Sequence, residues 1–339
     1  MKTTDFAECL ASYLTMYLPG HAGLSEDTIS SYRDTFKLVL MFAEKKRNIR
    51  AERIKLSDFN MNFVEAFLLW LEQERGCSIS TRNQRLTAIR AFAKYARGKK
   101  PEYLYESQKI LDFRRKKKPE TLVSHLTPDC IKDIIAQPDR YDRYGRRDVA
   151  LLSLLYDSAA RVSEICGVCI RDVRLKKPYT VILTGKGRKT RAVPIMEETA
   201  VVIETFIKEN RLHTADKANY PLFFNHQGGK LTRAGVAYIL KKHSQMARKT
   251  NLLIPSKVSP HIMRHSKAMH LLQAGVNLVY IRDFLGHSQV ETTEIYAKTD
   301  TETKRRLIEN AQIRIDPDLP DWAQDKSLMA LLTDLCGKD

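Results

Sequence analysis

Apolar side chains recur every three or four residues through the first third of the chain. This spacing places them on one face of a helix. One such face spans residues 29–43 and a second spans residues 63–71. Ser25 precedes the first face and Gly76 follows the second, as is typical of helix boundaries. The pattern predicts an α-helical domain over residues 1–113.

A further helix is predicted at residues 80–97, and its polar face carries the clearest signal. Its apolar side runs from Leu86 to Ala96. On the other side, polar and basic residues are spaced by four and three: Asn83, Thr87, Arg90, Lys94 and Arg97. A stripe of this kind fits a DNA groove, although an isolated stripe is as often a solvated helix face. We take Arg90, Lys94 and Arg97 as candidate DNA-binding residues.

Five consecutive cations, Arg114 to Lys118, stand before Pro119. Like charges repel one another and the proline ends helical geometry. Residues 114–124 are therefore predicted to be a basic linker that crosses near a phosphate backbone, with a nuclear-localisation signal as a weaker alternative. Three cations of the run join the DNA-binding candidates: Arg114, Arg115 and Lys116.

The second region begins at a helix-start signal, Thr127 followed by Pro128. A helix is predicted at 147–156. The period then changes to a strand-like run at 179–184, a glycine-flanked turn and a return strand at 191–195, which together predict a β-hairpin. Helices resume at Glu197. The expected fold is mainly α with a small β-hairpin: a helical domain, then a mixed α/β domain over 125–310.

The net charge of the chain indicates a polyanionic partner. The chain holds 57 Lys+Arg against 40 Asp+Glu, a net charge of +17. Residues 1–120 and 121–310 are both basic, which favours a footprint on nucleic acid that spans both domains. A basic protein with no nucleic-acid role is the alternative.

The last segment, 311–339, has three basic and six acidic residues and an apolar helical face. The apolar residues of this tail are Trp322, Leu328, Met329, Leu331, Leu332 and Leu335. Such a helix packs on its own domain or docks into a neighbouring subunit.

Several classes are disfavoured. The six cysteines are irregularly spaced, unlike a disulfide scaffold, and the Cys166-x-x-Cys169 pair lacks the second pair of a zinc site. We interpret both as buried helix residues. No signal peptide is evident, and no apolar run approaches about 18 residues. A cytoplasmic protein without a membrane partner is expected.

Metal-free phosphodiester transfer requires a nucleophile, cations for the phosphate oxygens and an acid for the leaving oxygen. Arg161 stands at the end of an apolar helix, where a guanidinium is costly unless it meets an anion. Glu164 is three residues on and provides a salt bridge, which can itself fix the guanidinium. Lys186 lies at the hairpin tip, where it can reach a leaving oxygen or be an ordinary turn lysine.

Downstream, His261 and Arg264 stand one turn apart at a predicted helix start and suit contact with a phosphate. A metal site through His261 and His265 is the alternative, but residue 262 is Ile and no third ligand is evident. His265 and His270 are expected to serve packing or hydrogen bonding.

His287 and Tyr296 complete the candidates. A tyrosine after a helix is ordinarily structural. Its pKa of about 10 makes it a poor nucleophile until cations lower that pKa or a base takes its proton. The two arginines and two histidines above provide such groups.

The ordered motifs resemble the catalytic domain of the tyrosine recombinases, the phage integrase family, over roughly residues 125–310. Five motifs carry this resemblance: Ala160-Arg161-Val162-Ser163-Glu164, Thr184-Gly185-Lys186-Gly187, His261-Ile262-Met263-Arg264-His265, Leu285-Gly286-His287 and Tyr296. The helical N-terminal region resembles the core-binding domain of that family.

The resemblance implies a role for each catalytic candidate. Tyr296 would form a 3′-phosphotyrosyl bond and release a 5′-hydroxyl, which Lys186 would protonate. Three side chains would hold the scissile phosphate: Arg161, Arg264 and His287. His261 would assist as an acid–base or hydrogen-bond partner. No cofactor and no metal would be required, because the phosphotyrosine conserves the bond energy.

The resemblance also implies an assembly. Family members work as four protomers on two DNA duplexes through a Holliday junction, and their C-terminal segments dock into neighbours. We therefore expect double-stranded DNA with specific sites, a homotetramer, a tail docked in trans, and a second recombinase or accessory protein as a further candidate partner.

After His265 the sequence departs from the usual family pattern and reads Ser266-Lys267-Ala268-Met269, closer to transposon-borne recombinases. This favours integration or excision of a mobile element in a bacterial cell. The alternatives are Xer-type dimer resolution, relaxation like that of a type IB topoisomerase, and a non-catalytic DNA-binding regulator.

Overall fold

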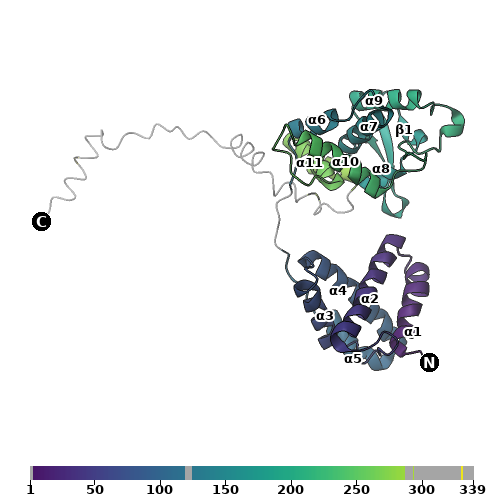
Figure 1. The fold of residues 1–339 in the computed structure, drawn as a ribbon, viewed down its shortest axis with the longest axis vertical. Coiled ribbons are helices and arrows are strands. Elements are labelled where there is room, and N and C mark those ends of the chain that lie inside the picture. Colours follow the sequence, from purple (N-terminus) through teal and green to yellow (C-terminus); the bar gives the residue numbers. More distant parts are fainter. Residues whose placement is uncertain (1–2, 119–123, 287–292, 294–329, 331–339) are drawn as a thin grey trace. The chain divides into compact units, whose positions relative to one another are not determined.

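The computed structural model describes residues 3–118 and 124–286, together with Thr293 and Ala330. It divides into two compact units, Met1–Thr121 and Leu122–Asp339, each with its own core. The fold is mostly helical with one small sheet, as the sequence predicts (Figure 1).

Helices are the only regular secondary structure among the described residues of the first unit. Its elements are α1 (Asp5–Ser12), a π-helical segment (Tyr13–His21), α2 (Glu26–Arg47), α3 (Met61–Gln73), α4 (Ile79–Lys99), a 3₁₀ turn (Pro101–Tyr103) and α5 (Leu104–Asp112). The predicted apolar faces at 29–43, 63–71 and 80–97 fall on α2, α3 and α4. Ser25 is the N-cap of α2, and Gly76, with a φ of +61°, follows α3.

Aromatic side chains fill the core of this unit. The ring of Phe92 on α4 meets Phe6, Phe36 and Phe59 edge-to-face, with centroids 5.5, 4.9 and 5.7 Å apart. Such geometry places the positive edge of one ring on the negative face of another. The apolar side predicted for α4 is therefore the side that faces the core.

The described part of the second unit contains seven α-helices, three 3₁₀ turns and three short strands. They are α6 (Pro128–Ala136), α7 (Arg143–Asp157), α8 (Val162–Gly167), a 3₁₀ turn (Ile170–Asp172), β1 (Val173–Arg174), β2 (Thr180–Thr184), a second turn (Lys186–Arg188), β3 (Thr190–Pro194), α9 (Glu197–Glu209), a third turn (Ala215–Lys217), α10 (Arg233–Ala247), α11 (Pro260–Gln273) and α12 (Leu278–Leu285).

The predicted hairpin is confirmed as β2 and β3, with β1 added on the other side of β2 to give an antiparallel sheet. Leu183 pairs with Arg191, and Val181 pairs with Val193. Because side chains alternate along a strand, these four residues lie on the same face. Val181, Leu183 and Val193 are buried there, so Arg191 lies on the inward face of the sheet.

Two sequence expectations differ from the structure in this unit. Arg161 was expected at the end of an apolar helix, but α7 ends at Asp157 and Arg161 is instead the N-cap of α8. Cys166 is buried in α8 as expected, whereas Cys169 lies after that helix and is only half-buried. The strand β1 escaped prediction because it has only two residues.

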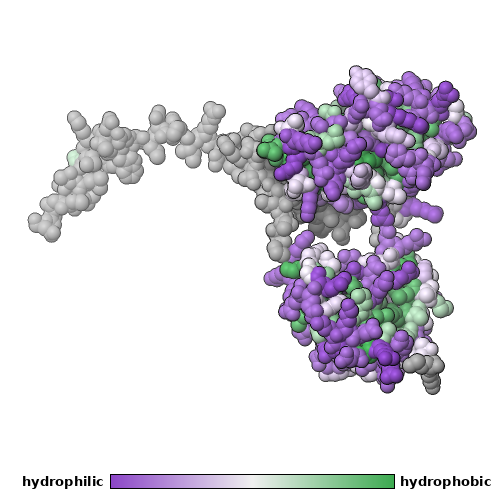
Figure 2. Space-filling model, viewed as in Figure 1, coloured by the Kyte–Doolittle hydropathy of each residue, from purple (hydrophilic) through white to green (hydrophobic). Residues whose placement is uncertain are grey.

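The surface of each unit is mostly hydrophilic in the view of Figure 2, in keeping with apolar side chains gathered in the two cores. No helix within the described ranges is both long and apolar enough to cross a membrane.

Candidate active site

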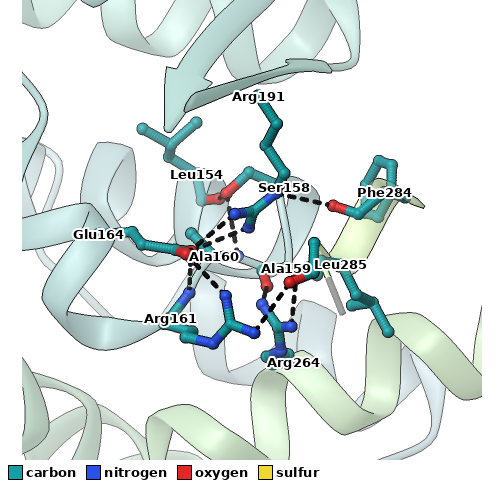
Figure 3. Close-up of polar contacts among 11 residues, drawn as sticks. Leu154, Ser158, Ala159, Ala160, Arg161, Glu164, Arg191, Arg264, Phe284 and Leu285 are labelled. Atoms are coloured by element: carbon teal, nitrogen blue, oxygen red, sulfur yellow. Dashed lines mark hydrogen bonds and ion pairs between the residues drawn. The ribbon is translucent and has the colours of Figure 1, made fainter. Parts of the chain in front are cut away.

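The C-terminal end of α12 is where three arginines from different elements meet. The last carbonyls of a helix have no partner within it and carry partial negative charge. The carbonyl oxygens of Phe284, Leu285 and Gly286 accept hydrogen bonds, in that order, from Arg191 Nε (3.1 Å), Arg264 Nη2 (2.7 Å) and Arg161 Nη2 (3.1 Å) (Figure 3). Three successive carbonyls thus gather three cations directly before His287.

Arg161 is fixed through Glu164, as the sequence predicts. Its Nη1 donates to Glu164 Oε1 and its backbone N–H to Oε2, both at 2.8 Å. The second bond is that of an N-cap whose third helical residue reaches back to it. The side chain of Arg161 is 36 % exposed, so its guanidinium is accessible to an anion from solvent.

Arg264 is buried, with 4 % of its surface exposed. It lies on α11, whose N-cap Ser259 accepts from the backbone N–H of Ile262 at 3.4 Å. Its Nη1 donates to the carbonyl of Ala159 at 2.7 Å, opposite the bond to Leu285. Ala159 has a φ of +46°, so this loop holds a left-handed conformation that costs an alanine about 1 kcal/mol.

Glu164 is the anion of the cluster, and its side chain is only 1 % exposed. Burial alone would raise its pKa. Hydrogen bonds from Arg191 and from the backbone of Arg161, with the nearby positive charges, instead lower the pKa to about 2. The carboxylate is therefore ionised at neutral pH and binds two guanidinium groups at once.

Lys186 lies in the turn between β2 and β3. The turn is closed by a bond from Gly185 N–H to the Lys189 carbonyl at 2.8 Å. Gly187 has a φ of +73°, a conformation that glycine adopts without steric cost. The backbone at Lys186 thus lies at the tip of the hairpin, as predicted.

The histidines of α11 differ in their surroundings. His261 is exposed in the first turn, and its ring lies 6.5 Å from that of His265. The pKa of His265 is lowered mainly by burial, and further by the charges of His261 and Arg264.

His270 confirms the expected hydrogen-bonding role. Its Nε2 lies 2.8 Å from the carbonyl of Leu126 and its Nδ1 2.8 Å from the hydroxyl of Tyr156. A carbonyl only accepts, so Nε2 carries the proton and Nδ1 accepts from Tyr156. Burial lowers the pKa of His270 and favours this neutral form.

Two catalytic candidates, His287 and Tyr296, lie outside the described residues, as does the tail beyond residue 310 apart from Ala330. Within the described ranges, no group of three His, Cys, Asp or Glu side chains is arranged to hold a metal ion.

The polar stripe of α4 has partners within its own unit. Arg90 donates to the carbonyl of Leu111, and Arg97 to Gln108 Oε1 at 3.1 Å. Lys94 is exposed. The stripe therefore packs in part against α5. Lys94 is more exposed to solvent than Arg90 and Arg97.

The basic run after α5 lies along the same stripe. Arg115 donates to Thr87 Oγ1 at 3.1 Å, and Lys116 exchanges two backbone hydrogen bonds with the amide of Asn83, at 2.8 and 3.2 Å. Lys116 also pairs with Glu72 at 2.6 Å. Residues 114–118 remain exposed, so the run forms a basic ridge on α4.

Arg191 is the site residue that sequence reasoning missed. The run Arg191-Ala192-Val193-Pro194-Ile195 alternates, with Val193 and Ile195 buried. By the same alternation Arg191 takes an inward position, and a cation there signals a buried anionic partner. That signal was present in the sequence.

The three convergent arginines lie beside the hairpin turn in a basic, mostly helical protein, and make this end of α12 a candidate site for an anion such as a phosphate. The model of the phage integrase family matches residues 124–303, and that of the phage integrase N-terminal SAM-like domain matches residues 11–100. The chain belongs to the phage integrase family, the tyrosine recombinases.

Named relatives extend over most of the chain. It is 36 % identical over 308 residues to a protein of Sinorhizobium fredii named as an integrase/recombinase, y4rC, covering 91 % of this chain and 92 % of that protein. It is 30 % identical over 285 residues to the tyrosine recombinase XerD of Halalkalibacterium halodurans, covering 84 % and 90 %.

Solved structures share the fold. The Tn1549 transposon integrase in complex with transposon right end DNA matches with a TM-score of 0.68 at 18 % identity, over 89 % of this chain and 98 % of that one. The XerH site-specific recombinase bound to difH substrate matches with a TM-score of 0.64 at 22 % identity, over 91 % and 88 %.

Proposed function

We propose that this chain breaks and rejoins DNA with Tyr296 as the nucleophile, on behalf of a mobile element. As a tyrosine recombinase the chain is a site-specific DNA recombinase. The residue roles, the assembly and the biological use are the parts that we propose.

The convergence of Arg161 and Arg264 at the end of α12 is the observation that carries the proposal. Two guanidinium groups from separate elements bond to adjacent carbonyls, those of Gly286 and Leu285. Two of the proposed phosphate-binding residues thereby lie side by side, and the third, His287, is the next residue in the chain after Gly286.

The chemistry follows from what these groups donate. A scissile phosphate beside the arginines would take hydrogen bonds on its non-bridging oxygens, where negative charge grows during attack. Attack by Tyr296 would leave the protein on the 3′ phosphate and expel the 5′ oxygen. Lys186, at the hairpin tip, would give that oxygen its proton, and His261, exposed in the first turn of α11, would assist as a hydrogen-bond partner.

Binding of the duplex is proposed to involve both units. The exposed ridge of Arg114, Arg115 and Lys116 supplies positive charge for phosphates, and Lys94 supplies more on α4. Arg90 and Arg97 contribute by supporting this face through their bonds to α5.

We also propose a homotetramer on paired sites, with the apolar tail docked into a neighbour and the reaction passing through a Holliday junction. Relatives named for integrase and for Xer functions leave two uses open, site-specific integration or excision and dimer resolution. The higher identity to the integrase/recombinase y4rC, 36 % against 30 % for XerD, favours the mobile-element use.

The unusual segment after His265 has a structural explanation in addition. Ser266 Oγ accepts from the backbone N–H of Leu126 at 2.8 Å, and Lys267 pairs with Asp157 at 3.0 Å. These contacts fasten α11 to the start of the second unit and to α7.

The experiment for Tyr296 is a nicked suicide duplex, which traps the covalent adduct. The native chain is expected to form the adduct and Tyr296→Phe none. Tyr280→Phe is the matched control, because it removes a hydroxyl from an exposed tyrosine on α12. Adduct formation by Tyr296→Phe would disprove the nucleophile assignment. With paired sites, a Holliday-junction product separates a recombinase from an enzyme that only relaxes supercoils.

A further inference from the structure

Arg191 makes contacts through every nitrogen of its guanidinium group, although none of the five recognised motifs includes it. Its Nη1 and Nη2 donate to the two oxygens of Glu164, each at 2.9 Å, and its Nε donates to the carbonyl of Phe284 at 3.1 Å. The side chain is 15 % exposed. All three guanidinium nitrogens are thus engaged within the protein.

The ion pair of Arg191 and Glu164 links β3 to α8 and α12. Glu164 passes the constraint to Arg161, because the same two carboxylate oxygens accept from Arg161 Nη1 and from its backbone N–H. In Figure 3, Glu164 lies between the two guanidinium groups. The orientation of Arg161 therefore depends on a carboxylate that Arg191 holds in place.

Two glycines pack directly against this pair. A Cβ at Gly286 would lie 2.8 Å from Arg191 Nη1, and a Cβ at Gly185 would lie 3.1 Å from Glu164 Oε1. Real Cβ atoms essentially never approach as closely as the first distance. Gly185 precedes Lys186 in the chain, and Gly286 precedes His287. The residues directly before Lys186 and His287 thus both pack against the Arg191–Glu164 ion pair.

We propose that Arg191 is a positioning residue of the strand-transfer site: by holding Glu164 and the end of α12, it sets the places of Arg161, the Lys186 turn and the backbone before His287. This inference rests on the proposed function, in which those residues meet the scissile phosphate. Arg191 itself touches no DNA in this scheme.

The guanidinium fork is essential to this role. A planar fork matches both oxygens of a carboxylate while its Nε serves a third acceptor, which the compact ammonium of lysine cannot do. Displacements of about 1 Å at a reacting centre can cost about 100-fold in rate. Loss of the fork should therefore reduce the chemical step more than DNA binding.

The test uses the full-length chain and single-turnover cleavage of the suicide duplex at saturating protein. Arg191→Gln is expected to cleave about 100-fold more slowly while its affinity for the duplex stays near that of the native chain. Arg191→Lys, which keeps the charge, should recover only part of the rate. Arg174→Gln, an exposed arginine on β1 of the same sheet, is the control and should cleave normally.

Coupling separates positioning from a general structural role. If Arg191 acts in part through Arg161, the double variant Arg161→Lys, Arg191→Gln should lose less rate than the product of the two single losses. Full multiplication of the two effects, or native cleavage by Arg191→Gln, would overturn the inference. Thermal unfolding checks each variant, and Arg191→Lys carries the same test should Arg191→Gln not fold.

The two proposals fail in different ways. Native cleavage by Arg161→Lys would refute the phosphate role of Arg161, and with it the frame of this inference. Impaired cleavage by Arg161→Lys beside native cleavage by Arg191→Gln would refute the positioning role alone.

Discussion

Arg191 binds both carboxylate oxygens of Glu164, at 2.9 Å each, from the inward face of a three-stranded sheet. The contact joins a strand to the short helix that carries Arg161. Loss of this ion pair should lower the free energy of unfolding at low pH.

We predict a loss of stability through protonation of Glu164. Its pKa is lowered from the ordinary 4.5 to about 2, so the unfolded chain binds the proton more readily. The contribution is complete above about pH 4.5 and is lost as the pH falls toward 2. Its size is on the order of 3 kcal/mol, since one pKa unit is about 1.4 kcal/mol.

Urea unfolding of the native chain and of Glu164→Gln, followed from about pH 6 downward, measures this contribution. The variant should be less stable at the upper end and should show a shallower decline below about pH 4.5. Parallel curves would show that Glu164 contributes nothing to the acid response.

Gly286→Ala should impair cleavage through a steric effect. The added methyl group would enter the space of the Arg191 guanidinium, and Gly286 has a φ of +65°. Gly275→Ala is the matched control: its φ is +84°, and a Cβ there meets nothing within 4 Å. Each variant should lose about 1 kcal/mol from backbone strain.

Only Gly286→Ala should also lose at least about 10-fold in single-turnover cleavage, because only it displaces a positioning group. Equal cleavage by the two alanine variants would mean that the packing of Gly286 on Arg191 is unimportant to the reaction.

A second buried ionic cluster is predicted to serve stability alone. Asp148 accepts from Arg147 at 2.7 and 3.0 Å and pairs with His243 at 2.9 Å, and all three side chains are at most 7 % exposed. Asp148→Ala leaves a guanidinium buried without its counter-ion, which costs about 3–5 kcal/mol.

Denaturant midpoints check this value. Asp129→Ala removes an aspartate that is 81 % exposed and pairs with Lys132, and should change stability by less than about 1 kcal/mol. A loss at Asp148 no larger than at Asp129 would contradict the assigned role of the buried cluster.

Removal of the residues after Ile315 should separate binding from recombination. The segment removed is acidic and contains the apolar face from Trp322 to Leu335. Duplex affinity should stay near that of the full chain, while synapsis and recombination fall, because the link between protomers is lost. Gel mobility of single-site and paired-site complexes measures both. Undiminished recombination would indicate that the tail packs on its own subunit.

Much of the architecture could be predicted from local patterns. Helical spacing located α2, α3 and α4, and the change of period at residue 179 located the hairpin. Thr127 and Pro128 marked the start of α6. Each of these features is encoded within a few residues, where propensity and tertiary structure agree.

The site was predictable only as far as motifs extend. Glu164 could be matched to Arg161 because the two are three residues apart. The bonds from Arg191 and Arg161 to the end of α12 join residues that are 93 and 125 positions apart. Sequence spacing does not reveal contacts over such separations. The α4 stripe shows the same limit, since its partners on α5 could not be seen from its periodicity.

The end of α12 has a consequence for exchanging parts between recombinases. Its three terminal carbonyls receive donors from α8, β3 and α11, so one inserted or deleted residue in this helix would rotate them by about 100° and remove all three bonds together. A chimera that imports α12 alone should therefore fail unless the imported helix keeps both its length and its terminal glycine. A functional graft would have to transfer α12 together with the hairpin and the segments that carry Arg161 and Arg264.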